Sequence, residues 1–181
     1  MKHLLKAALT FIAVTFFITS FAQNTGAYLK YDLNGKTISH KGEELNNYNV
    51  YEPGEGDTRP CNEHVLYLSY VAKAVYKMDI KILTPPHTVP VAGKLPYVQT
   101  VYSPNAPCPA VHISVTKQEG DEYAFYAAVD ENEGHFEITK VAAGWVEGKF
   151  DIELPLLFAD GEVLHITNGS FRFKIEKESK N

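Results

Sequence analysis

One tryptophan and the acidic residues that follow it are the side chains best suited to bind a ligand. Trp145 is the only tryptophan of the chain. Apolar residues occupy the even positions from 146 to 154, so Trp145 shares the polar face of a predicted strand with Glu147, Lys149 and Asp151. An indole stacks on the apolar face of a sugar, and carboxylates accept hydrogen bonds from its hydroxyls. These residues predict a carbohydrate- or surface-binding site; the alternative is that a loop covers Trp145 at the strand start.

A second candidate surface is the segment 84–109, which holds seven of the ten prolines. Prolines at this density interrupt helices and strand ladders, so the segment is predicted to be a long loop. A loop of this length is uncommon in a compact domain unless it is functional or disordered. A short strand is expected from Tyr97 to Tyr102, and both tyrosines join the ligand-binding candidates.

Motifs for catalysis or metal binding are incomplete. Ser114 and Lys117 have the spacing of a serine–lysine nucleophile pair, but on a strand this spacing directs them to opposite faces. Residues 130–135 alternate oxygen ligands without the glycine and glutamate positions of a calcium loop. The histidines form no HExxH or other close metal pair. We therefore expect no enzyme, no cofactor and no metal; a small hydrolase using histidine and carboxylate is the less favoured alternative.

The elements that position these residues are predicted to be strands, because apolar and polar residues alternate along most of the chain. Residues 42–60 are predicted to be loop, and residues 64–74 fit either a strand or a helix, with strand favoured. Other strands are expected at 27–32, 76–82, 111–116, 123–129, 136–141 and 146–154. Many short strands with frequent turns predict an all-β antiparallel two-sheet sandwich, and a β-barrel is the alternative.

Asn168-Gly169 predicts a two-residue hairpin between strands 163–167 and 170–175. This turn would pair Ile166 with Phe171 and Leu164 with Phe173, which places four apolar side chains on one face.

The N-terminal segment predicts export. Residues 1–22 combine a basic start, an apolar run and the small residues Ser20 and Ala22, which is typical of a signal peptide cleaved after Ala22. Residues 23–181 are then expected to form a single domain, periplasmic or secreted, without stable membrane insertion. The residue directly after Ala22 is Gln23 and not cysteine, so no lipid anchor is expected. The two cysteines, Cys61 and Cys108, are expected to form a disulfide, with two separate buried thiols as the alternative.

The net charge of the chain restricts the classes of partner that it is expected to bind. The chain has 17 basic and 22 acidic side chains, a net charge of −5, and loss of Lys2 and Lys6 with the signal peptide makes the charge more negative. An acidic surface repels nucleic acid, so nucleic acid is not an expected partner. A glycan or an envelope protein is expected instead, and a structural or protein-interaction role is the alternative function.

Short segments, most of them in the C-terminal half, resemble segments of other exported proteins in their order along the chain. The segments Gly134–Thr139, Val146–Phe150 and Ile166–Phe171, together with Asn34-Gly35-Lys36, follow an order similar to that of small exported bacterial proteins catalogued as domains of unknown function. The resemblance implies a β-sandwich and carries over no catalytic residue. Many of those relatives are lipoproteins, whereas this chain lacks the anchor cysteine.

Overall fold

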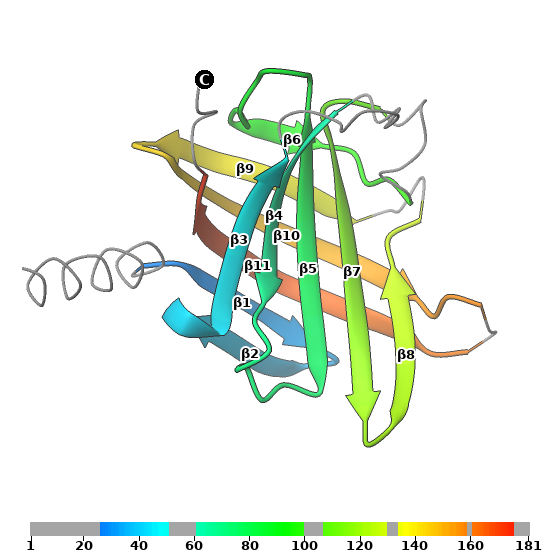
Figure 1. The fold of residues 1–181 in the computed structure, drawn as a ribbon. Helices are drawn as coiled ribbons and strands as arrows, with labels where there is room; N and C mark the ends of the chain where they lie inside the picture. Colours follow the sequence, from blue (N-terminus) through cyan, green and yellow to red (C-terminus); the bar gives the residue numbers. More distant parts are fainter. Residues whose placement is uncertain (1–25, 51–60, 100–106, 130–133, 159–160, 176–181) are drawn as a thin grey trace, which may run out of the picture.

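The computed structural model describes residues 26–50, 61–99, 107–129, 134–158 and 161–175 (Figure 1). The predicted signal peptide, Tyr102 and residues 130–133 lie outside these ranges. Among the described residues, no helix is long and apolar enough to cross a membrane.

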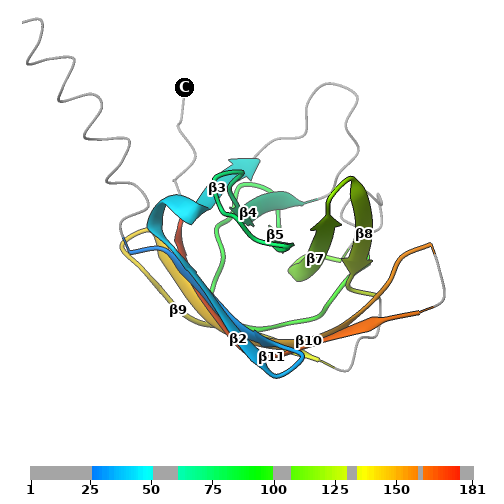
Figure 2. The ribbon, with the colours of Figure 1, turned by 90° about the horizontal axis from the view of Figure 1, so that it is seen from below.

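Two antiparallel sheets pack face to face, as Figure 2 shows from one end. The first sheet has the strand order β2 (Lys36–Lys41), β1 (Tyr28–Leu33), β11 (Val163–Lys174), β10 (Trp145–Pro155), β9 (His135–Ala142) and β6 (Gly93–Leu95). The second has the order β3 (Leu45–Val50), β4 (Asn62–Leu68), β5 (Tyr76–Thr84), β7 (Ala110–Glu119) and β8 (Glu122–Ala127). The predicted sandwich is confirmed, and the sheets do not close into the alternative barrel.

The core lies between the sheets and follows the alternation of the sequence. On β10 the even residues from Val146 to Leu154 are buried, and on β7 Val111, Ile113 and Val115 are buried, as predicted. The rings of Phe136 and Phe171 stack at the centre of the first sheet, with centroids 5.2 Å apart. Burial of these apolar side chains is the main favourable contribution to folding.

The predicted hairpin at Asn168-Gly169 is wrong, because β11 runs as one strand from Val163 to Lys174. Its register with both β1 and β10 shifts by one residue near these positions, which is a β-bulge. A type I′ hairpin needs positive φ at both central residues, whereas only Asn168 has it, with φ 52°. Before the extra residue the even-numbered Leu164 and Ile166 face the core. After it the odd-numbered Phe171 and Phe173 face the core. Because the chain does not reverse, the predicted pairs Ile166–Phe171 and Leu164–Phe173 do not form, and Ile166 and Phe171 instead face Ile152 and Gly148 of β10. A hairpin and a bulge change the alternation of the sequence in the same way, which explains the wrong prediction.

Two strands lie in segments for which the sequence predicts loop. Residues 45–50 form the edge strand β3, preceded by a 3₁₀ turn at Gly42–Glu44, although its asparagines have low strand propensity. Pairing with β4 stabilises it, and Asn47 Nδ2 donates to the Lys174 carbonyl oxygen at 2.6 Å. Gly93–Leu95 form a short strand in the proline-rich segment. Of the predicted strand 97–102, the described residues 97–99 form no strand, Tyr97 makes a single bridge to Val111, and residues 100–102 lie outside the described ranges. For residues 64–74 the favoured strand is confirmed only as far as Leu68, where β4 ends. Residues 69–74 form the connection to β5 and are not a strand.

The predicted disulfide is present between Cys61 and Cys108, whose Cα atoms are 6.2 Å apart. Cys61 directly precedes β4 and Cys108 closely precedes β7. These strands both run antiparallel to β5, so both begin at the same end of the sheet. Cys61 and Cys108 pack there with Leu83, Val98 and Ala110, a cluster separate from the main core.

Candidate functional site

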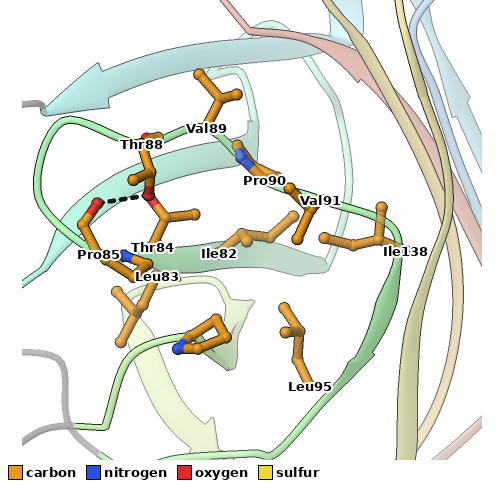
Figure 3. A pocket seen from close by; sticks show the side chains of 11 residues that line it. Ile82, Leu83, Thr84, Pro85, Thr88, Val89, Pro90, Val91, Leu95 and Ile138 are labelled. Atoms are coloured by element: carbon orange, nitrogen blue, oxygen red, sulfur yellow. Dashed lines mark hydrogen bonds between the residues drawn. The ribbon is translucent and has the colours of Figure 1, made fainter.

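An apolar pocket opens at the end of the sandwich where β5 finishes, at the top of Figure 1. It has a volume of about 310 Å³ and lies between the end of β5, the segment 85–91, β6 and β9. Ligand pockets in proteins have volumes of roughly 300–1,000 Å³. Figure 3 shows the side chains that surround it: Ile82, Leu83, Thr84, Pro85, Thr88, Val89, Pro90, Val91, Leu95 and Ile138, with Pro109 as the eleventh.

Almost every atom facing this pocket is carbon. The two hydroxyl groups of its wall are engaged within the protein. Thr84 Oγ1 donates to the Thr88 carbonyl oxygen at 3.0 Å. Thr88 Oγ1 donates to the Pro85 carbonyl oxygen at 2.6 Å, and Figure 3 marks a hydrogen bond to Pro85. No charged side chain lines the pocket among the described residues. The pocket therefore suits an uncharged, apolar group.

The rim of the pocket is held in one conformation by hydrogen bonds and prolines. Asn62, buried in β4, donates from Nδ2 toward the carbonyl oxygens of Pro85 and Thr88, at 3.4 and 3.2 Å. The Thr88 amide donates to the Pro85 carbonyl oxygen at 3.1 Å, which closes a turn. Proline fixes its own φ at positions 85 and 90, so little conformational freedom is left for a ligand to restrict.

A buried histidine supports the wall from the interior. His64 lies in β4 with its Nδ1 2.9 Å from Asn49 Oδ1 and its Nε2 3.1 Å from Thr84 Oγ1. Burial lowers the pKa of His64 to about 4, so the ring is neutral at physiological pH. The polar group behind the pocket wall therefore adds no charge there.

The residues predicted around Trp145 share the outer face of the first sheet, as expected, but their polar groups are already paired. The Arg172 guanidinium lies over the Trp145 ring, 4.4 Å from its centroid, and the indole also packs against the core. Arg172 Nε lies 3.5 Å from Glu147 Oε1. Stacking of a sugar on Trp145 would have to use the ring surface that Arg172 leaves free.

The two other charged candidates on β10 also form ion pairs. Lys149 Nζ lies 3.0 Å from Glu137 Oε2, and Asp151 Oδ2 lies 2.9 Å from His135 Nδ1. A cross-strand lysine holds the pKa of Glu137 below its usual range by hydrogen bonding. Carbohydrate binding at this face stays a prediction.

Of the two tyrosine candidates, Tyr97 does not lie on this face. Tyr97 is buried between the sheets, with its hydroxyl 3.0 Å from the His135 carbonyl oxygen and 3.2 Å from that of Asp151. Burial raises the pKa of Tyr97, with the Asp151 charge as a smaller cause. Tyr102 lies outside the described residues.

Histidine and carboxylate do approach each other, but on an exposed sheet face. His135–Asp151 and His165–Glu153 are cross-strand pairs, each with an N···O distance of 2.9 Å. Neither pair lines the apolar pocket. Within the described ranges, no group of three or more histidine, cysteine, aspartate or glutamate side chains is arranged to hold a metal ion.

The sequence pointed to one wall of the pocket only. The density of prolines marked 84–109 as a candidate surface, and Pro85, Pro90 and Pro109 line the pocket. The opposite wall comes from Ile138 on β9, which lies 29 residues beyond Pro109 and 53 beyond Pro85, and no local pattern links it to the prolines. Comparisons of the chain with family models, with curated proteins and with solved structures return no match.

Proposed function

We propose that the protein is an exported, non-enzymatic binding protein of the cell envelope or extracellular space that holds a small apolar group in the pocket under residues 85–91. The ligand is an uncharged hydrocarbon moiety, free or carried on a larger envelope molecule. The predicted signal peptide supports export, and a disulfide is typical of an oxidising compartment.

The carbon lining of the pocket is the observation that carries this proposal. Val89 and Val91 are 40 % and 66 % exposed at the rim, although an apolar side chain gains by leaving water. A bound hydrocarbon would cover both valines without leaving a polar group unpaired, because the hydroxyl groups of Thr84 and Thr88 already have partners.

Titration with 1-octanol, followed by ¹³C-methyl NMR, tests the proposal. We expect saturable shifts of the Val89, Val91 and Leu95 methyl resonances. The double variant Val89→Asp/Val91→Asp places two carboxylates at the rim and is expected to weaken octanol binding by roughly tenfold or more. Val163→Asp on β11 is the matched control, because Val163 is a similarly exposed valine that does not line the pocket.

The outcome separates binding from misfolding. The amide spectrum of the double variant should match that of the parent outside the rim, since both valines are partly exposed. Absence of saturable methyl shifts, or equal affinities of the parent and the double variant, would overturn the proposal.

A carbohydrate at the Trp145 face is the second candidate function. The outward positions of Trp145, Glu147 and Lys149 on one strand favour it. A glycan screen on the processed protein, with Trp145→Ala as the comparison, tests this candidate: binding that Trp145→Ala leaves unchanged would contradict it.

A further inference from the structure

A second pocket opens at the opposite end of the sandwich, where β5 begins, at the bottom of Figure 1. Its volume is about 600 Å³. One wall comes from β1, β2 and their connecting turn, and the other from residues 73–76 before and at the start of β5. It shares no lining residue with the apolar pocket.

This pocket combines an apolar surface with uncompensated positive charge. Its apolar wall contains Leu33, Ile38, Ala74 and Val75. Lys36 and Lys73 line it from the two opposing walls, and neither forms an ion pair with any residue that the structure describes.

The one acidic residue in the lining is paired with a lysine outside it. Glu119 Oε1 lies 3.4 Å from Lys117 Nζ, which also lies 3.9 Å from Glu162 Oε2. Lys36 and Lys73 outnumber the single carboxylate of the lining, so the lining carries a net positive charge that favours an anionic group.

A buried histidine in the same lining lacks a hydrogen-bond partner. His40 is 8 % exposed, and both ring nitrogens are buried. Its Nδ1 lies 3.4 Å from Glu44 Oε2 without a hydrogen bond, and Nε2 has no partner among the described residues. Because an imidazole always carries at least one N–H, this arrangement leaves a buried donor without an acceptor, which is costly. A carboxylate oxygen that reached this wall would accept a hydrogen bond from His40 once the ring turned toward the pocket.

We propose that this pocket binds an amphipathic carboxylate, a molecule with an unbranched apolar body and a single anionic head, of the fatty-acid class. The apolar body contacts Ile38, Ala74 and Val75. The head lies between Lys36 and Lys73 and accepts a hydrogen bond from His40. The site is independent of the apolar pocket, so the protein carries one site for a neutral group and one for an anion.

Sodium octanoate, monitored through the methyl resonances of Ile38 and Ala74 and the ring ¹⁵N resonances of His40, tests the proposal. We expect saturable shifts at all three residues with octanoate and none with octylammonium, which has the same chain and the opposite charge. Lys36→Glu/Lys73→Glu is expected to weaken octanoate binding by roughly tenfold or more. Lys30→Glu, an exposed lysine on the outer face of β1, is the matched control.

The two pockets are distinguished by testing each ligand on the variant that changes the other pocket. Octanoate shifts at Ala74 should persist in Val89→Asp/Val91→Asp, and octanol shifts at Leu95 should persist in Lys36→Glu/Lys73→Glu. Equal binding of octanoate and octylammonium, unchanged octanoate affinity in the charge-reversed variant, or absence of shifts at Ala74 would overturn the proposal whatever the result at the apolar pocket.

Discussion

Gly169 on β11 lies directly against Phe150 on β10. A Cβ atom on Gly169 would stand 2.5 Å from the Phe150 carbonyl oxygen and 2.7 Å from its ring. Backbone cannot move away from such a contact without disturbing the β10–β11 ladder, and Phe150 is fully buried. The bulge therefore depends on glycine at this position.

Gly169→Ala is expected to lower the free energy of unfolding by roughly 2–3 kcal/mol, because a methyl group is forced into packed backbone and ring atoms. Urea denaturation of the parent and the variant measures the difference. Gly161→Ala is the control: its Cβ would be 3.6 Å from Leu156, an ordinary contact, and the change should stay within about 0.5 kcal/mol. Equal effects of the two substitutions would contradict the close packing at Gly169.

Acid should destabilise the fold through His64. Burial lowers its pKa from 6.5 to about 4, so the unfolded chain takes up a proton at a higher pH than the folded protein does. Stability should fall as the pH drops from about 6.5 to about 4, with a contribution of roughly 3 kcal/mol from this residue. Urea denaturation across this range, compared with His64→Gln, isolates the effect; an unchanged pH slope in the variant would count against it.

The contribution of Asp79 to stability should depend on pH in the opposite direction to that of His64. Burial raises its pKa from 3.8 to about 6, so the folded protein keeps this proton to a higher pH than the unfolded chain. Its contribution to stability is therefore lost as the pH rises from about 4 to about 6. Asp79→Asn is expected to raise the thermal midpoint at pH 7.5 and to have little effect near pH 3.5. A variant with the same midpoint as the parent at pH 7.5 would show that ionised Asp79 is not penalised.

The disulfide should contribute strongly to stability, because Cys61 and Cys108 are 47 residues apart in sequence. A crosslink that closes a loop of this length stabilises a protein by about 4 kcal/mol in the chain-entropy account. Thermal unfolding with and without a reducing agent, and in Cys61→Ala/Cys108→Ala, measures the contribution. Coincident midpoints in all three samples would rule out a stabilising role.

Arg172 should shield Trp145 from solvent, since its guanidinium lies 4.4 Å from the ring centroid. Arg172→Ala is expected to increase quenching of Trp145 fluorescence by acrylamide, and the single tryptophan makes the signal unambiguous. Lys149→Ala, on the same face but paired with Glu137, should leave the quenching constant unchanged. Equal quenching in the parent and Arg172→Ala would mean that the guanidinium does not cover the ring in solution.

The sequence predicted the strands with clear alternation and the crosslink between the two cysteines. β10 is the clearest case, because its burial alternates as its residues do. β3 was missed because its asparagines resemble a loop, and its stability comes from β4 and from a contact with Lys174, neither of which is local. The bulge at Asn168 was mistaken for a turn, because alternation records only which face a residue occupies and not whether the chain reverses.

The candidate sites depended more on tertiary packing than the strands did. Trp145 was placed on the correct face, but its partner Arg172 comes from the neighbouring strand and could not be assigned once a hairpin was assumed. Both pockets join residues that are distant in sequence, such as Leu95 with Ile138 and Ile38 with Ala74. Local patterns in a single sequence do not contain those relationships.

The bulge in β11 also limits how the length of this chain can vary. The bulge is one extra residue of β11, so deleting Asn168 would restore a regular ladder in which Ile166, Gly169 and Phe171 still face the core. A single deletion elsewhere in β11 would instead reverse the orientation of the residues between the deletion and one end of the strand, because successive side chains point to opposite faces. A deletion scan through residues 163–174 should therefore give a folded product for the loss of Asn168 and destabilised products on either side of the bulge.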